Sequence, residues 1–349
     1  MIDYRLKENR LPYFKRLYNL NLLYKVHPGL VYLYMPELKK HFNWDDETAL
    51  WFATINGHTQ NPITSMRLFE IMPSIPQSNE EWKKAQAWFD KEWANLSFDT
   101  DRNKQKKDTI KGLYSYAQLV KEAGSQTQLW SKKKHYDELW ETANKIQSFG
   151  RLSSFSYLEY VKLNGYGADC TDLIFNDLSG SRSHRNGMFF LLGMDDYVFD
   201  KRQENSHDGK YDDFENMCEQ LETKAEKFLR DYQEEYGYCS NISKFTLESC
   251  LCQFKNGFFS RRYPGVYADM GWDRIKWYDT RKMKQYTEVF KDIRRKTLPT
   301  WLREECEKDP IPRSFKATQF AETGFPFRGD HLFSKEEMQL LKKLEQSGE

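Results

Sequence analysis

The hydrophobic positions of this chain recur at three- and four-residue spacing over most of its length. Trp82, Ala85 and Phe89 follow this spacing behind Ser78-Asn-Glu-Glu81, a sequence whose first and last residues can cap the start of a helix. Strict alternation of polar and apolar residues, which marks a half-buried strand, is scarce. The pattern therefore predicts an all-α protein.

Other helices are marked by their ends. A long helix is expected from about Asp213 to Tyr236, with Gly237 as its stop signal, and another from Ser334. An apolar helix capped near Asp45 or Asp46 is expected to run to Asn56. We expect peripheral N-terminal helices in residues 1–40, a catalytic core in residues 41–300, and a C-terminal extension with a helix in residues 301–349.

Charge and composition narrow the functional classes. The 53 Lys and Arg residues nearly balance the 52 Asp and Glu residues, so any contact with nucleic acid must come from local clusters. No apolar run approaches the length of a membrane span, and the first residues lack the apolar region of a signal peptide. A cytoplasmic protein is expected. The six cysteines form no CxxC pair, so neither a disulfide framework nor a structural zinc site is expected.

Two features leave alternatives open. Residues 101–111 contain five basic side chains, which could form a solvated surface or contact phosphates: Arg102, Lys104, Lys106, Lys107 and Lys111. Aromatic residues make up 16% of the chain, and they could fill the core or stack on unpaired bases.

Residues 153–178 predict a helix-hairpin-helix. The first helix is expected to be capped by Ser153 or Ser154, the turn to lie at Asn164-Gly165-Tyr166-Gly167, and the second helix to run from Ala168 to about Leu178. Amides at the start of such a second helix point at a DNA phosphate. A plain packing corner between two helices is the alternative.

This hairpin resembles that of the helix-hairpin-helix DNA glycosylases. In that family, a lysine in the first turn of the second helix, or an aspartate further downstream, drives base excision. Here Ala168 and Asp169 occupy the first turn, and Ser181-Arg-Ser-His-Arg-Asn186 occupies the downstream segment. The resemblance therefore implies a shared scaffold without the excision chemistry.

Three further segments carry candidate chemistry. Gly180 to Gly187 holds two arginines and a histidine, which could form a flexible anion cradle or a polar surface loop. Phe245 to Arg262 places Glu248 and Lys255 on the same face of a helix, where they could share a pocket or form an ordinary ion pair. Asn56-Gly-His-Thr-Gln-Asn-Pro62 gathers groups that can read a base edge or cap helices.

Together these segments, from about residue 40 to 265, resemble the α-glutamyl/putrescinyl thymine pyrophosphorylase family. Its members are the amino-acid:DNA transferases of bacteriophage hypermodified-thymine pathways. The resemblance rests on Thr59-Gln-Asn-Pro62 after an apolar helix, the Gly-Tyr-Gly hairpin with Asp177-Leu178 beyond it, the basic Gly-bounded segment, and Glu248-x-x-Leu-Cys-x-Phe-Lys255.

The resemblance implies a transferase that acts on double-stranded DNA. An amine, either an amino acid or a polyamine, would displace pyrophosphate from the pyrophosphorylated 5-hydroxymethyl group of a flipped pyrimidine. No metal site or other cofactor is implied, apart from a magnesium ion that could accompany the pyrophosphate. A glycosylase for a modified base and a non-catalytic DNA-binding protein are the alternatives.

The implied reaction needs a base, cations for the leaving group, and contacts to the pyrimidine and the DNA. Candidate catalytic residues are His184, Glu248 and Asp169. Candidate phosphate clamps are Arg182, Arg185, Lys255, Arg261 and Arg262. Candidate contacts to the pyrimidine are Asn56, His58, Gln60 and Asn61, and candidate contacts to the DNA backbone are Gly165, Tyr166 and Gly167.

Overall fold

The computed structural model describes residues 6–24, 31–100, 102–177, 180–198, 214–237, 242–258, 270–281, 283–298, 300, 303–304 and 307. All regular elements in these ranges are helices, which confirms the all-α prediction. None of these helices combines the length and the apolar character that crossing a membrane requires. The chain divides into two compact units: unit 1 contains residues 1–28, 170–269 and 298–349, and unit 2 contains residues 29–169 and 270–297.

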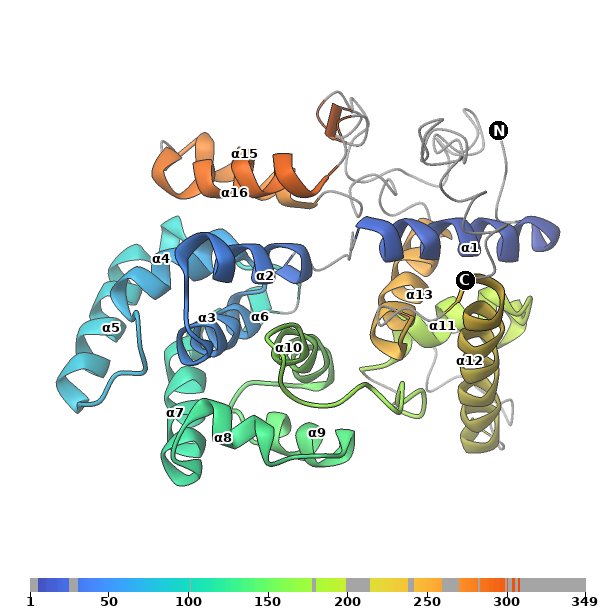
Figure 1. Ribbon diagram of the computed structural model, residues 1–349, viewed down its shortest axis with the longest axis horizontal. Coiled ribbons are helices and arrows are strands. Elements are labelled where there is room, and N and C mark those ends of the chain that lie inside the picture. The colour runs from blue at the N-terminus through green and yellow to red at the C-terminus, as the bar shows by residue number, and fades with distance from the viewer. Residues whose placement is uncertain are drawn as a thin grey trace. The chain divides into compact units, whose positions relative to one another are not determined.

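Unit 2 is built around one buried helix (Figure 1). Its helices are α2 (Val31–Phe42), α3 (Asp46–Thr59), α4 (Pro62–Ile71), α5 (Asn79–Glu92), η1 (Trp93–Asn95), α6 (Arg102–Gln105), η2 (Lys106–Asp108), α7 (Thr109–Ala123), α8 (Gln126–Ser131), α9 (Tyr136–Asn144), α10 (Arg151–Leu163), α15 (Met270–Asp279) and α16 (Lys284–Thr297). Residues 49–59 of α3 are all buried, because α4, α7, α8 and α10 pack around them. The α15–α16 pair packs on α2 and α4.

The predicted caps of unit 2 are present. The Ser78 hydroxyl accepts a hydrogen bond from the Glu81 amide, and the Glu81 carboxylate accepts one from the Ser78 amide, so the predicted capping box starts α5. The Asp45 carboxylate accepts from the Thr48 amide at 2.8 Å and starts α3. Both predicted helices are confirmed.

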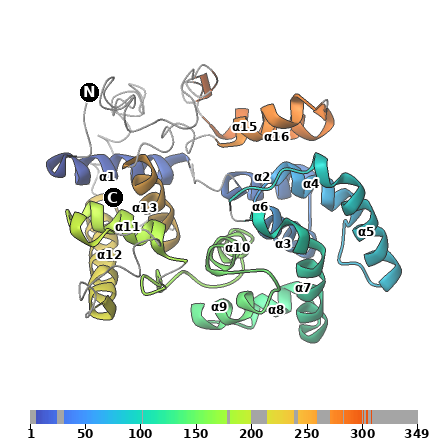
Figure 2. The same ribbon diagram turned by 180° about the vertical axis from the view of Figure 1, so that it is seen from behind.

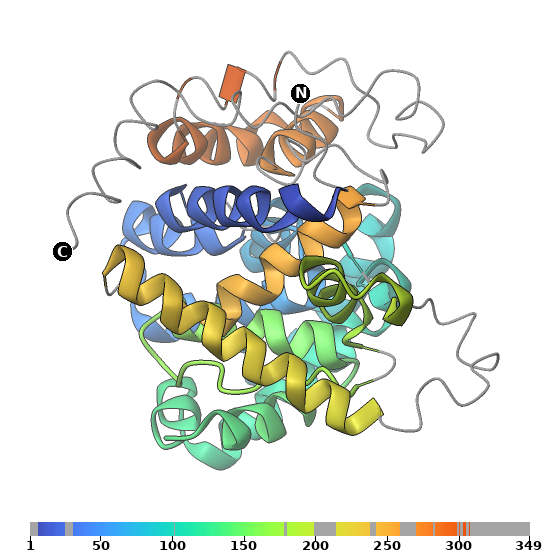
Figure 3. The same ribbon diagram turned by 90° about the vertical axis from the view of Figure 1, so that its right-hand side faces the viewer.

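Unit 1 contains α1 (Lys7–Tyr24), α11 (Arg182–Leu191), η3 (Asp195–Tyr197), α12 (Phe214–Tyr236) and α13 (Lys244–Phe258). Helix α11 packs most closely on α13, and α1 runs across α13 (Figure 2). The long α12 is seen from the side in Figure 3. It ends just before Gly237, whose φ of 80° confirms the predicted stop signal.

Some predictions concern residues that the structure does not describe. The helix expected from Ser334 lies outside the described residues. The predicted domain boundaries near residues 40 and 300 are a separate matter, and they stay predictions. In the described ranges, Cys170, Cys218, Cys250 and Cys252 are not joined in disulfide bonds. Among the described residues, no group of three or more His, Cys, Asp or Glu side chains is arranged to hold a metal ion.

Candidate functional site

The predicted hairpin forms only in part. Helix α10 ends at Leu163, and Gly165 and Gly167 adopt φ values of 88° and 83°, as the predicted turn requires. The helix begins at Arg151, however, so Ser153 and Ser154 lie inside it as buried residues and do not cap it. The predicted second helix from Ala168 is wrong, because residues 168–174 have no regular structure. Without that helix, its amides are not arranged to point at a phosphate.

Polar groups keep residues 171–177 out of a helix. The Asp172 carboxylate accepts from the Ile174 amide at 2.7 Å, a local hydrogen bond that competes with helix formation. The Lys244 ammonium donates to the Thr171 carbonyl, and the Glu222 carboxylate accepts from the Leu173 amide. These long-range contacts fix an irregular course that helical periodicity could not reveal.

The other hairpin residues have partners of their own. The Tyr166 hydroxyl donates to the Asp46 carboxylate at 2.5 Å, and this hydrogen bond raises the pKa of Tyr166 to about 12. Asp169, a candidate catalytic residue, has a half-exposed carboxylate that pairs with Lys162. Its predicted place in the first turn of a helix is therefore wrong, although a catalytic role stays a prediction.

The basic segment from Gly180 to Gly187 is not a flexible cradle, because it forms most of α11. A Cβ atom on Gly187 would lie 2.1 Å from the Leu251 carbonyl oxygen, so the glycine allows α11 and α13 to meet backbone to backbone. Arg185 is fully buried and donates to the carbonyls of Phe175 and Asp177, at 2.8 and 2.9 Å. Its phosphate-clamp role stays a prediction, but in this structure Arg185 holds the segment before α11.

Two candidate catalytic residues meet at this crossing of helices. His184 of α11 places Nδ1 3.3 Å from Oε1 of Glu248 of α13, and both side chains are buried. The other ring nitrogen, Nε2, lies 2.9 Å from the Leu173 carbonyl oxygen. Because a carbonyl can only accept, Nε2 carries a proton. Nδ1 is then the ring nitrogen that faces the carboxylate.

The four predicted pyrimidine contacts lie together where α3 meets α4. Gln60 ends α3 in the left-handed conformation, with a φ of 52°, and Asn61 caps α4 ahead of Pro62. Exposed fractions are 0% for Asn56, 2% for His58, 7% for Gln60 and 0% for Asn61. The structure therefore brings these residues together and shields them from solvent.

The amide oxygens of this cluster are all engaged. The Asn56 oxygen accepts from the Ser65 hydroxyl at 2.9 Å, and the Gln60 oxygen accepts from the Tyr160 hydroxyl at 2.6 Å. The Asn61 oxygen accepts from the amides of residues 63 and 64, both at 3.2 Å.

The amide nitrogens of Asn56, Gln60 and Asn61 have no hydrogen-bond partner among the described residues. A buried polar group without a partner costs about 1–3 kcal/mol, and such groups are rare in native proteins. Three such groups within residues 56–61 are unusual. We call these three NH₂ groups the amide donors; they suit a ligand group that is rich in hydrogen-bond acceptors.

His58 lies in the last turn of α3, two residues before Gln60. Its ring is 4.6 Å from the ring of Phe149 and packs against Gly112 of α7. Burial, with a contribution from the nearby Arg102 guanidinium, lowers the pKa of His58 to about 3. His58 is therefore neutral at physiological pH and can exchange hydrogen bonds with a ligand without adding charge.

The roles of the other candidate phosphate clamps stay predictions. Lys255 is a buried residue of α13, and Arg182 is half-buried in the first turn of α11. Arg261 and Arg262 lie outside the described residues. Sequence reasoning missed the buried Lys244, which contacts Glu222 at 2.5 Å and Glu226 at 2.9 Å. Burial acts to lower the pKa of Lys244, but its two carboxylate partners raise it.

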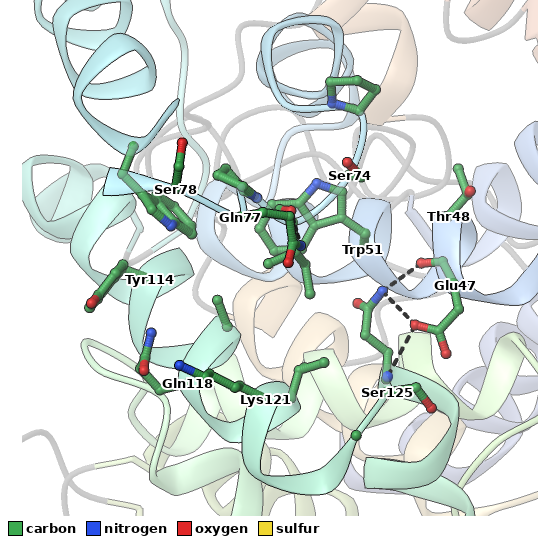
Figure 4. A pocket seen from close by; sticks show the side chains of 18 of the residues that line it. Glu47, Thr48, Trp51, Ser74, Gln77, Ser78, Tyr114, Gln118, Lys121 and Ser125 are labelled. Carbon is green, nitrogen blue, oxygen red and sulfur yellow. Dashed lines mark hydrogen bonds between the residues drawn. The ribbon is translucent and has the colours of Figure 1, made fainter. Parts of the chain in front are cut away.

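Unit 2 also has a cleft of about 770 Å³ that the sequence did not indicate (Figure 4). One wall is a face of α7 with Tyr114, Gln118 and Lys121, and the opposite wall is the start of α3 with Glu47. Residues 73–79, Trp51 and Trp82 complete its lining. Burial acts to raise the pKa of Glu47, but hydrogen bonds from Thr127 and Gln126 lower it below its usual value.

The fold places this protein in the broad class of helical proteins with buried polar clusters: the amide donors lie in unit 2 and the His184–Glu248 pair in unit 1. Comparison with known families narrows the class. Residues 31–263 match the amino acid:DNA transferase family, and the chain belongs to that family. The match includes the amide donors, the hairpin and the His184–Glu248 pair.

The chain is also similar to a protein of Salmonella phage ViI that is named serinyltransferase. The two are 29% identical over 356 aligned positions, which cover 95% of this chain and 85% of the relative. No solved structure gives a significant match. The family match confirms the predicted kind of protein, an enzyme that transfers amino acids to DNA.

Proposed function

We propose that this enzyme transfers an amino acid to a pyrimidine of DNA that carries a pyrophosphorylated 5-hydroxymethyl group. The amine of the amino acid attacks the 5-methylene carbon, a C–N bond forms, and the C–O bond to pyrophosphate breaks. Pyrophosphate leaves with the bonding electrons, and the amine gives up one proton. The family match supports transfer to DNA, and the name of the phage relative makes serine the first donor to test.

The amide donors are the observation that carries this proposal. Their oxygens are held by Ser65, Tyr160 and the first amides of α4, so their NH₂ groups are fixed in place before any ligand binds. The ring carbonyls of a pyrimidine are acceptors that such groups can hold. Once the site has opened, donors fixed in this way orient the base at little further cost in entropy. The base must leave the stack to reach such a site.

The His184–Glu248 pair is proposed as the base that accepts the proton of the attacking amine. An amine attacks only in its neutral form, so an enzyme gains by placing a proton acceptor beside it. His184 and Glu248 are both buried, and Nδ1 lies 3.3 Å from Oε1, so we propose that the proton is taken up here. A magnesium ion, if one takes part, is proposed to arrive bound to the pyrophosphorylated DNA.

Mass spectrometry of nucleosides tests the proposal. DNA that contains 5-hydroxymethyluracil would be pyrophosphorylated by a matching kinase and ATP, then incubated with this protein and serine, a mixture of other amino acids, or polyamines. We expect a new nucleoside whose mass shows one amino acid in place of the pyrophosphate.

Two other results would contradict the proposal. A pyrophosphorylated base that stays unchanged while the protein binds the DNA would indicate a non-catalytic binding protein. Free base in the supernatant would indicate a glycosylase.

A further inference from the structure

The exposed face of α7 carries a row of side chains that the proposed reaction does not use. Lys111, Tyr114, Gln118 and Lys121 follow one another at spacings of three, four and three residues, which places them on one face of the helix. Lys107 precedes them by four residues, in the η2 turn that leads directly into α7. All five side chains are exposed, and we call them the α7 stripe.

The stripe carries unneutralised positive charge. Within the described residues, none of its three lysines forms an ion pair, although ion pairs are frequent elsewhere on this protein. The net charge of the whole chain is only +1, so attraction of a polyanion depends on local clusters of this kind.

The stripe runs into the cleft described above. Tyr114, Gln118 and Lys121 form one wall of that cleft, and their side chains are directed along it (Figure 4). Tyr114 is 42% exposed, and its ring meets the ring of Trp82 edge to face, with centroids 5.3 Å apart. An exposed aromatic ring beside a lysine and an amide is the combination that holds an unpaired base, because the ring stacks, the amide bonds to base edges and the lysine contacts a phosphate.

The acidic residues of the cleft do not oppose this use. The Asp45 carboxylate is hydrogen-bonded to the start of α3, and the Glu47 carboxylate to the start of α8. The positive ends of these helices offset the two negative charges. Lys121, on the opposite wall, stays available for a phosphate.

We propose that the α7 stripe is the track of an unpaired DNA strand, and that the cleft between Tyr114 and Glu47 holds one of its bases. From Lys107 to Lys121 the helix rises about 21 Å, from 14 residues at about 1.5 Å each. A stacked strand advances about 3.4 Å per nucleotide, and an unpaired strand can be more extended, so the stripe spans at most about six nucleotides. The inference rests on the proposed function in one respect, since it takes DNA to be the substrate.

The test is the salt dependence of binding to a fluorescein-labelled 12-mer of thymidylate, measured by fluorescence anisotropy with the full chain. The stripe variant replaces its three lysines: K107Q, K111Q and K121Q. A control variant loses the same charge at exposed lysines elsewhere: K134Q, K145Q and K224Q. Each phosphate contact contributes about 0.7 to the slope of log K against log salt for a single strand, so the stripe variant is expected to reduce that slope by about 2.

The aromatic part of the inference is tested at Tyr114. We expect Y114S to weaken binding on the order of ten-fold with an unchanged salt slope, and Y114F to bind like the wild type, because stacking needs the ring and not the hydroxyl. Equal salt slopes for the stripe and control variants would overturn the inference. So would a slope change confined to duplex DNA, because the track would then not be that of an unpaired strand.

These binding measurements use unmodified DNA and need no transfer. If the stripe variant shows the reduced salt slope but no new nucleoside is formed, the proposed function is wrong and the track stands. If the new nucleoside forms but the stripe and control variants have equal salt slopes, only the track is wrong.

Discussion

Asn61 offers a sharp test of the amide donors, because its two polar atoms serve different purposes. Its oxygen caps α4 through the amides of Ile63 and Thr64, and its nitrogen is one of the unpartnered donors. Serine caps helices as well as asparagine does but has no NH₂ group, and alanine lacks both. The variants Asn61→Ser and Asn61→Ala therefore separate the cap from the donor.

The two variants are expected to differ in stability and to agree in activity. Loss of the cap in Asn61→Ala should lower the free energy of unfolding by about 1 kcal/mol, and Asn61→Ser should stay within about 0.5 kcal/mol of the wild type. Loss of one hydrogen bond to the base, about 0.5–1.5 kcal/mol, should reduce transfer by up to about ten-fold in both.

Urea unfolding and the yield of modified nucleoside provide the two measurements. If Asn61→Ser transfers as well as the wild type and only Asn61→Ala is impaired, then activity follows stability. In that case Asn61 is a helix cap only, and the reasoning about the donors is refuted.

Three further predictions follow from other parts of the structure. Gly187→Ala would force a Cβ atom against the Leu251 carbonyl and should cost about 1–3 kcal/mol in urea unfolding; wild-type stability would show that the helices do not meet there. The pKa of His58 is about 3 in the folded protein, against 6.5 for a solvated histidine in the unfolded chain. Its contribution to the free energy of unfolding is therefore full above pH 6.5 and is lost as the pH falls towards 3, at no more than about 1.4 kcal/mol per pH unit. His58→Leu should lose less stability in acid than the wild type does, and an unchanged pH dependence of stability would contradict the burial of His58. Arg182→Ala should lower transfer, and transfer at the wild-type rate would remove Arg182 from the candidate clamps. Arg185→Ala removes the donor to the buried Phe175 carbonyl and the part-buried Asp177 carbonyl, and it should lower the free energy of unfolding by about 1–3 kcal/mol.

The helices of this protein could be predicted where local sequence determines them. The capping box at Ser78 and the stop at Gly237 depend only on neighbouring residues, and both lie where the sequence placed them. The prediction of the second hairpin helix was wrong because distant residues determine the structure there. The chain after Gly167 is held by Lys244, Glu222 and other groups that are distant in sequence, and no local pattern contains them.

For the candidate site, the sequence indicated which polar residues lie close together but not how their atoms are engaged. The run Asn56 to Pro62 indicated polar recognition or helix capping, and Asn61 supplies a cap with its oxygen and a free donor with its nitrogen. The glycine that was taken as a source of flexibility, Gly187, is instead a close helix contact. The sequence indicated only the first part of the α7 stripe, because the basic run ends at Lys111. It did not predict the cleft further along the helix.

The burial of the amide donors has a consequence for the speed of binding. A base cannot reach groups that are at most 7% exposed unless the protein opens locally first. The rate of association is then limited by how often the site opens, and the apparent affinity is reduced by the fraction of molecules that are open. Association with the modified base should therefore approach a plateau as DNA concentration rises, at a rate that hydrogen exchange of the α3–α4 junction would report independently.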